Sequence, residues 1–338
     1  MDSPRMPRRS LPSVERVVVI FLCLLLGLSL LSVCFGSYPL NLFAYSTWDA
    51  TSRNVFFGLR LPRVLAGILA GGVLGVTGAI CQTVFCNPLA SPDITGVASG
   101  ASFGAAAAIL LGCAGFVRIG FAFISGLGAL VLLLLLVRLS GSAGAEQKSR
   151  YLLAGILVSS AADAGLMILK TAADPERELA AIEFWTMGSL ASLTAQKFIL
   201  MALSSLPPLI LLFLFSRQAL ILSRGREEAR AVGVSPALWQ MILLFLTTWA
   251  VAGVVSTVGV IGFIGLIVPH MALAIGRKRS RGFLPLCFLI GAILTVISDL
   301  LARTVVSGSE LPVSIFSVGF AVIWFTCLFC TGKVTEEA

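Results

Sequence analysis

The sequence RQALILSRGREEARAVGV, residues 217–234, is a long charged interruption between two strongly apolar segments. It carries four arginines against two acids, Glu227 and Glu228. An excess of arginine between two membrane spans is typical of a cytoplasmic loop. Within it, GREEARAVG has good helix formers, acids near its start and Gly233 as a stop signal, so it predicts a short helix. Such a helix is either a solvated connector or a docking surface for a cytoplasmic protein.

The composition of the whole chain is that of a membrane protein. Of the 338 residues, 58% are hydrophobic and only 12% are charged, and the mean hydropathy is +1.01. Soluble globular domains do not have this balance, so we predict an all-α polytopic membrane protein. The net charge of +8 comes from cations at segment ends, which indicate topology rather than a nucleic-acid-binding face.

The sequence offers little for metal, cofactor or catalytic chemistry. It has a single histidine, His270, and most of its eight cysteines lie inside apolar runs as small packing residues. The pairs Cys81 with Cys86 and Cys327 with Cys330 lack the further ligands that zinc needs. No Walker A or HExxH sequence occurs. We therefore expect no cofactor, no bound metal and no catalytic residue.

Apolar runs of about 20 residues, long enough to cross a bilayer, define the organisation of the chain. Ten candidates occur, at residues 14–35, 63–84, 93–111, 117–139, 151–170, 198–215, 237–257, 260–276, 283–303 and 312–330. An even number of spans puts both termini on one side, and arginine-rich connections assign that side to the cytoplasm. We expect a cytoplasmic tail at 1–13, one transmembrane domain at 14–330 and a cytoplasmic tail at 331–338.

Glycine is enriched in two of these spans and recurs at regular spacing along two helix faces. The spans 93–111 and 260–276 are short and rich in glycine, and such spans in corresponding halves of a transporter point to its transport path. Glycine recurs at every fourth position in two stripes, Gly67, Gly71 and Gly75, then Gly96, Gly100 and Gly104. In lipid such stripes let backbones approach closely, so the second and third spans are predicted to pack tightly inside the bundle.

Two connections carry local predictions. The segment 87–93 has two prolines and ends on Asp93 in front of a helix, which favours a tight turn with an N-cap. The longest outside loop, 172–196, contains an apolar run from Ile182 to Leu190 that predicts a short helix at the membrane surface.

Few ionisable residues lie within the spans. Asp163 stands alone, whereas Asp299 and Arg303 are four residues apart, a spacing that permits an ion pair on one helix face. Intramembrane charges are functional candidates. Asp163 is therefore either a proton or cation site or a structural residue. The Asp299–Arg303 pair is likewise either functional or structural. His270 is interpreted as a satisfied interfacial residue. The bundle is transporter-like, and its energy comes from a partner or from a downhill solute gradient.

An ordered set of motifs resembles one family. The set comprises Arg60–Arg63, Gln82, Asn87–Ala90, Gly96–Ala101, Gly225–Val234, Gly262–His270, Asp299–Arg303 and Glu310–Val313. From about residue 55 to the C-terminus, the chain resembles the FecCD-type permeases of ABC importers for iron–siderophore, haem and vitamin B12. Two departures are Val260, where the family usually has proline, and Asp163, in a span expected to be uncharged.

The resemblance implies a type II ABC importer permease with about ten transmembrane helices per subunit. It also implies a homodimer or close pair with the path along its two-fold axis, two cytoplasmic ATPase subunits seated on 217–234, and a solute-binding protein outside. The loop residues assigned to ATPase coupling are Arg226, Glu227, Glu228, Arg230 and Gly233.

The resemblance also assigns residues within the spans. In the family, arginines that match Arg60, Arg63 and Arg303 pair with acids of the binding protein, a role that suits the planar guanidinium fork, and ordinary interfacial anchoring is the alternative. Helix packing and the translocation path are assigned to the two glycine stripes together with Gly262, Gly265 and Pro269.

The resulting hypothesis is a permease subunit in the bacterial plasma membrane, with both termini cytoplasmic. It imports a metal chelate by ATP-driven alternating access and performs no reaction itself. The alternative is an ion- or proton-coupled secondary transporter that uses Asp163 and Asp299. Which chelate or oxyanion is carried stays open.

Overall fold

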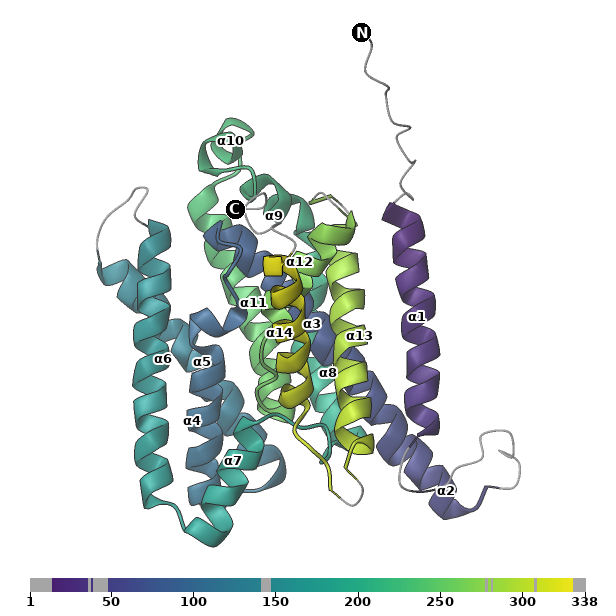
Figure 1. Cartoon of the computed structure of the whole chain (residues 1–338). Coiled ribbons are helices and arrows are strands. Elements are labelled where there is room, and N and C mark those ends of the chain that lie inside the picture. Colours follow the sequence, from purple (N-terminus) through teal and green to yellow (C-terminus); the bar gives the residue numbers. More distant parts are fainter. Residues whose placement is uncertain are drawn as a thin grey trace.

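The computed structural model describes residues 14–35, 38, 48–140, 147–276, 279–280, 282–306 and 309–330. Within these ranges the regular structure is helical (Figure 1). The expected tails at 1–13 and 331–338 lie outside the described residues, and so does the side chain of Arg226.

Ten apolar helices make up the described bundle, and they match the ten predicted spans. Eight are long and apolar enough to cross a membrane: α1 (Val14–Cys34), α3 (Leu61–Phe85), α5 (Gly115–Leu139), α6 (Gln147–Ala172), α8 (Ala195–Leu214), α11 (Pro236–Val258), α13 (Phe283–Thr304) and α14 (Val313–Cys330). The two shorter ones are α4 (Val97–Leu110) and α12 (Ile264–Gly276). Short elements connect them: α2 (Ala50–Asn54), η2 (Val55–Arg60), η3 (Pro92–Thr95), η4 (Pro175–Leu179), α7 (Ala180–Thr186), α9 (Ser216–Leu222) and α10 (Arg226–Ala231).

Three of the long helices form the interior of the bundle. α3, α11 and α13 bury most of their residues, and α3 runs on from α2 and η2 as one continuous element. A helix that is apolar on all sides belongs inside a bundle or in lipid. α1 and α6 flank the molecule on opposite sides (Figure 1) and bury few residues. α1, for example, leaves Val19, Ile20 and Leu30 exposed, as a lipid-facing helix should.

Glycine brings α3 into backbone contact with α13. A Cβ at Gly71 would collide with the carbonyl oxygen of Gly291, and a Cβ at Gly75 would collide with that of Cys287. Gly67, the first member of the stripe, has only ordinary contacts, because a Cβ there would lie 3.6 Å from the nearest side-chain atoms. The contact therefore depends on the middle and the end of the stripe.

The second stripe packs α4 against α5. A Cβ at Gly100 would lie 2.8 Å from the carbonyl oxygen of Ser125, and one at Gly104 would lie 2.5 Å from that of Phe121. Gly96 has a different use, because its φ of 77° lies in the left-handed region that favours glycine and sets the start of α4.

The two short helices occupy equivalent places, each the third in a half of five. α4 has 14 residues and α12 has 13, about 20 Å at 1.5 Å per residue, less than the roughly 30 Å of a hydrocarbon core. Each follows a left-handed residue, Gly96 before α4 and Phe263 (φ 65°) before α12. Irregular backbone at membrane depth is tolerated where protein surrounds it.

The turn before α12 is attached to α14 by two hydrogen bonds. Ser314 Oγ on α14 donates to the carbonyl oxygen of Val260 at 2.8 Å, and Ser317 Oγ donates to that of Gly262 at 2.9 Å. Further along, a Cβ at Gly265 would lie 2.8 Å from the ring of Pro92. Val260, which replaces the proline usual in the family, thus takes part in the turn through its carbonyl group.

Two local predictions were wrong in detail. Asp93 does not cap a helix: it lies inside η3, because Pro92 starts a 3-10 turn that closes when Gly96 N donates to Asp93 O at 3.0 Å. The helix expected from Ile182 to Leu190 ends at Thr186 in α7. The chain reverses at Gly188, whose φ is 70°, and Leu190 is fully buried rather than at a surface.

The contact between α3 and α13 predicts a matched pair of substitutions. Gly71→Ala should lower the free energy of unfolding by about 1–3 kcal/mol, because the added methyl group overpacks the contact with Gly291. Gly128→Ala on α5 is the control, since no atom lies within 4 Å of the added carbon, and it should leave stability unchanged or slightly higher. Thermal unfolding of both variants in detergent measures the difference, and equal midpoints would contradict the role of Gly71.

Candidate functional site

The predicted loop forms two short helices at one end of the bundle (Figure 1). α9 contacts α3 and α11 and buries Ala219. α10 stands beyond the ends of the spans, and of its residues 227–231 it buries Ala229 alone. The exposed residues of α10 and its C-terminal turn include Glu227, Glu228, Arg230 and Val232. These charges and the apolar Val232, which is 65% exposed, are open to contact with a partner.

Gly233 ends α10, as the sequence predicted. Its φ is 79°, its N–H donates to Arg230 O at 3.0 Å, and the N–H of Val234 donates to Ala229 O at 2.9 Å. This pair of hydrogen bonds is the Schellman arrangement, which needs a left-handed residue at this position and therefore favours glycine. Behind this turn lies a groove of about 350 Å³, lined by Arg230, Gly233 and residues 234–237.

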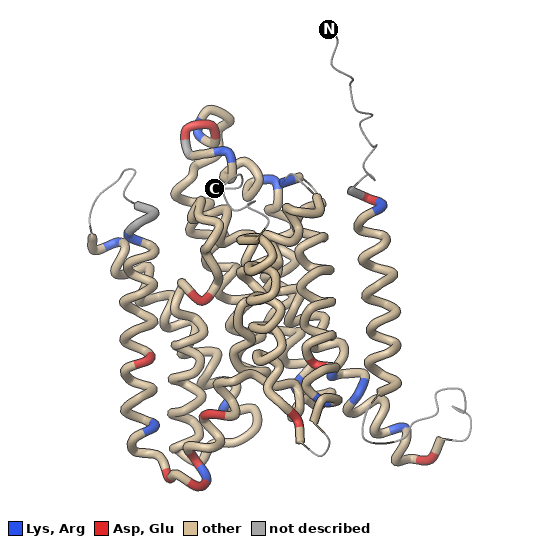
Figure 2. Tube along the Cα trace, viewed as in Figure 1, with Lys and Arg blue, Asp and Glu red and all other residues tan. Residues whose placement is uncertain are grey.

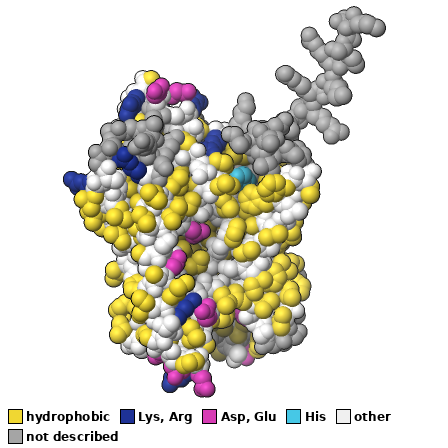
Figure 3. All heavy atoms as spheres, turned by 60° about the vertical axis from the view of Figure 1, so that its left-hand side comes forward, with side chains coloured by type: hydrophobic (Ala, Val, Ile, Leu, Met, Phe, Trp, Pro, Cys, Tyr) yellow, Lys and Arg dark blue, Asp and Glu magenta, His cyan; other side chains and the backbone are white. Residues whose placement is uncertain are grey.

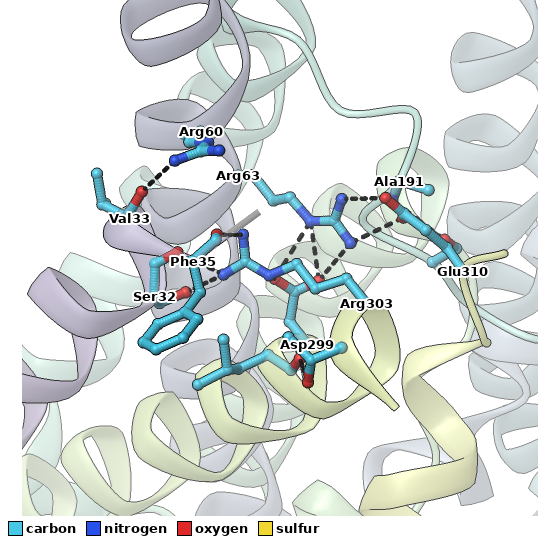
Figure 4. A network of polar contacts seen from close by, with 12 residues as sticks. Ser32, Val33, Phe35, Arg60, Arg63, Ala191, Asp299, Arg303 and Glu310 are labelled. Carbon is cyan, nitrogen blue, oxygen red and sulfur yellow. Dashed lines mark hydrogen bonds and ion pairs between the residues drawn. The ribbon is translucent and has the colours of Figure 1, made fainter. Parts of the chain in front are cut away.

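The three predicted docking arginines lie together at the opposite end of the bundle (Figures 2 and 4). Arg63 is the centre of this network. Its Nε and Nη2 bind Asp299 at 3.0 and 2.9 Å, and its Nη1 and Nη2 bind Glu310 at 3.0 and 2.9 Å. The Asp299 side chain is only 3% exposed, whereas that of Glu310 is 39% exposed. Arg63 therefore joins α3 to a buried acid on α13 and to an accessible acid in the connection to α14.

Arg60 and Arg303 satisfy the end of α1. Arg60 Nη1 donates to the carbonyl oxygens of Val33 and Cys34 at 2.9 and 3.1 Å. Arg303 Nη2 donates to Ser32 O at 2.7 Å, and its Nη1 donates to the carbonyl of the residue after the helix at 3.2 Å. The last carbonyls of a helix have no partners within the helix, and cations are favoured there. The two arginines are thus bound internally rather than free.

The charges of this network do not cancel. Arg63 and Arg303 contact the carboxylates of Asp299 and Glu310, whereas Arg60 binds only backbone carbonyls, so three guanidinium groups and two carboxylates leave one net positive charge. Arg303 Nε lies 3.6 Å from Asp299 Oδ2, so the ion pair expected from the four-residue spacing exists, but it is longer than the contact of Asp299 with Arg63. The network therefore presents positive charge at this end of the molecule.

The remaining ionisable candidates lie apart from both regions. The face that carries α6 shows charged side chains among hydrophobic ones (Figure 3), and on it Asp163 is exposed. His270 Nδ1 lies 2.8 Å from Leu266 O and its ring meets Phe325 edge-on, so the histidine is held within the bundle. Among the described residues, no group of three or more His, Cys, Asp and Glu side chains could hold a metal ion.

The partners of Arg63 were not predicted from the sequence. Asp299 and Glu310 both lie in the motifs quoted above, but their pairing with Arg63 joins positions 236 and 247 residues apart. The signal available was an arginine at membrane depth, which needs an acid or several carbonyls. No feature of the sequence indicated that Arg60 and Arg303 donate to the carbonyls at the end of α1, or that a groove lies behind α10.

The sequence model of the FecCD transport family matches residues 22–331. The chain belongs to the FecCD transport family. It is accordingly a multi-pass transport subunit.

Two curated relatives of this FecCD chain cover most of its length. The vitamin B12 import system permease protein BtuC of Salmonella typhi is 34% identical over 293 residues, which is 86% of this chain and 88% of the relative. The putative ABC transporter permease protein MJ0087 of Methanocaldococcus jannaschii is 33% identical over 340 residues, which is 94% of this chain and 95% of the relative.

Solved structures show the same fold. An inward-facing conformation of a putative metal-chelate type ABC transporter matches with a TM-score of 0.86 and 29% identity, covering 94% of this chain and 99% of that chain. PsaBC from Streptococcus pneumoniae in complex with Fab matches with a TM-score of 0.55 and 16% identity, covering 78% and 89%. The second likeness concerns the fold alone.

The arginine network predicts unequal effects for its two acids. Asp299→Asn removes a buried carboxylate and leaves Arg63 and Arg303 with fewer partners, so it should cost about 3–5 kcal/mol of unfolding free energy. Glu310→Gln, at an accessible site, should cost no more than about 1 kcal/mol. Thermal unfolding of the purified variants compares them, and a larger loss for Glu310→Gln would contradict this division.

Proposed function

We propose that this chain is the membrane-spanning subunit of an ATP-driven importer that takes up a metal chelate delivered by a solute-binding protein. In this proposal α10 meets a cytoplasmic ATPase, the arginine network meets the binding protein, and a second copy completes the path in a bacterial plasma membrane. The observation that carries the proposal is the separation of the two regions, since α10 and the network lie at opposite ends of one bundle (Figure 2).

The charge distribution supports the assignment of sides. The end with α10 also carries Arg138 at the end of α5 and Arg150 near the start of α6. Positive charge in short connections favours the cytoplasmic side. α1 begins and α14 ends at this same end (Figure 1), in keeping with an even number of spans and with two cytoplasmic termini.

The exposed residues of α10 and the groove at Gly233 support the proposed contact with the ATPase. Glu227, Glu228, Arg230 and Val232 are exposed, and the groove at Gly233 can receive part of a partner. α9 follows directly on the end of α8 and lies against α3, so a push on the loop reaches the interior helices. Movement of packed rigid helices is a known route to alternating access.

The docking end is supported by its net charge and by the accessibility of Glu310. A carboxylate of the binding protein that reaches Arg63 competes with Glu310 rather than with the buried Asp299. The bidentate geometry of Arg63 toward Glu310 can be copied by an incoming acid. Docking would then exchange one carboxylate for another and free the connection between α13 and α14.

Pairing with a second copy is supported by Asp163. Its carboxylate is exposed on α6, a membrane-spanning helix. A charged side chain at the centre of a bilayer costs about 2.5–3.5 kcal/mol on insertion scales, so such residues face protein or water.

The named cargo of the relatives, vitamin B12 and a metal chelate, supports a metal chelate as the class of substrate.

A secondary transporter is the second candidate, and the structure gives it less support. Asp299 is bound by Arg63 and Arg303, so it is not available as an ion site. Asp163 would act without a chain of neighbouring acids, whereas proton relays in transporters use such chains.

Reconstitution in lipid vesicles tests the function. Vesicles that contain this chain, its ATPase subunits and internal ATP should take up a metal chelate such as cobalamin or a ferric siderophore from the cognate binding protein, and an uncoupler should not stop the uptake. Vesicles with this chain alone are the control and should accumulate nothing. Accumulation by the chain alone that collapses with an uncoupler would establish the secondary transporter instead.

The turn at Gly233 predicts the effect of a bulky residue in the loop. Gly233→Val forces a β-branched side chain into a left-handed conformation, so it should distort the turn and reduce ATP-driven uptake at least about tenfold while membrane insertion stays normal. The control is Gly27→Val on α1, where no atom lies within 4 Å of an added carbon. Uptake by the Gly233→Val protein at the rate of the control would remove the loop from the mechanism.

A further inference from the structure

A second cavity lies inside the subunit, at the end of the bundle that carries α10. It encloses about 190 Å³ between the end of α3, α9 and the connection from α12 to α13. Its polar lining consists of Thr83, Ser216, Arg217, Ser223, Arg279 and Ser280. The volume is below the roughly 300–1,000 Å³ of a typical small-molecule pocket, so it suits a single head group.

Arg279 is fixed at the wall of this cavity by neutral partners. Its Nη1 donates to Thr83 Oγ1 at 2.9 Å, and its guanidinium lies 5.8 Å from the centre of the Phe283 ring. Burial lowers the pKa of Arg279, which indicates a charge that has lost water without gaining an acid. Such a guanidinium is oriented and still able to bind an anion.

The cavity has no counter-ion of its own among the described residues. Its lining contains two arginines and no Asp or Glu. The sequence from Ala229 to Ser298 contains no acidic residue, and Arg277, Lys278 and Arg281 are neighbours of Arg279 in the sequence. A partly buried charge is more stable when it is paired, so the two arginines are able to take up an anion.

The geometry points to a phosphate group as that anion. Two arginines and several hydroxyl groups converge on a small space, and guanidinium groups bind phosphate with parallel hydrogen bonds. The rest of the lining is apolar and includes Ile80, Phe283 and Leu284 at the ends of membrane-spanning helices. A phosphate that arrives with an acyl chain fits both halves of this lining.

We propose that this cavity binds the phosphate head group of an anionic phospholipid from the leaflet on the α10 side. Basic pockets between transmembrane helices on the cytoplasmic side are a known setting for anionic head groups. This site is separate from the transport function proposed above. Only the assignment of the leaflet to the cytoplasmic side rests on that function. A bound head group connects Arg217 on α9 with Arg279 before α13. It therefore stabilises the position of α9, the helix that precedes α10.

The test measures thermal unfolding of the purified full chain in detergent, titrated with short-chain phosphatidylglycerol, short-chain phosphatidylcholine or inorganic phosphate. Phosphatidylglycerol should raise the unfolding midpoint more than phosphatidylcholine does. Arg217→Gln and Arg279→Gln should each raise its half-maximal concentration about fivefold, the loss expected for one arginine near a lipid head group. Arg138→Gln, an exposed arginine at the end of α5 outside the cavity, is the control and should respond as the unmodified chain does.

Arg217→Gln keeps the test decisive if Arg279→Gln does not fold, because Arg279 also holds Thr83. Equal responses to both lipids, or full responses in both cavity variants, would overturn the proposal. A response to inorganic phosphate at the same concentrations, lost in both variants, would support an anion site but overturn its assignment to a lipid.

Discussion

Backbone contact along α3 is the interaction on which the rest of the bundle depends. At Gly71 and Gly75 this helix lies directly against α13, and at Gly78 a Cβ would collide with the carbonyl oxygen of Gly265 on α12. No side chain separates the helices at these points, so their spacing is fixed by the backbone itself. α3 also carries Arg63 near one end and Thr83 near the other. One rigid element therefore positions both the arginine network and the α9 region.

The arginines at the end of the bundle opposite α10 join helices. Arg60 and Arg303 complete the hydrogen bonds of the end of α1, and Arg63 joins α3 to α13 and to the connection before α14. In lipid, an unsatisfied polar group is costly, so a contact of this kind fixes which helices are neighbours. The accessible Glu310 is the part of this arrangement that a partner can replace without exposing a buried charge.

The sequence was enough for the architecture and for the position of the loop, because both follow from properties read over many residues. Apolar runs of sufficient length predicted all ten helices, and Gly233 predicted the end of α10. The partners of Arg63 could not be predicted, since they depend on how distant helices meet. The role expected of Asp93 failed for a local reason, because Pro92 starts a different turn from the one assumed.

Ser314 and Ser317 have a mechanical consequence. Their hydroxyl groups hold the carbonyls of Val260 and Gly262, so α14 cannot twist or slide alone without breaking both hydrogen bonds, at about 1 kcal/mol each. We therefore expect α14 and α12, together with the turn before α12, to move as one unit.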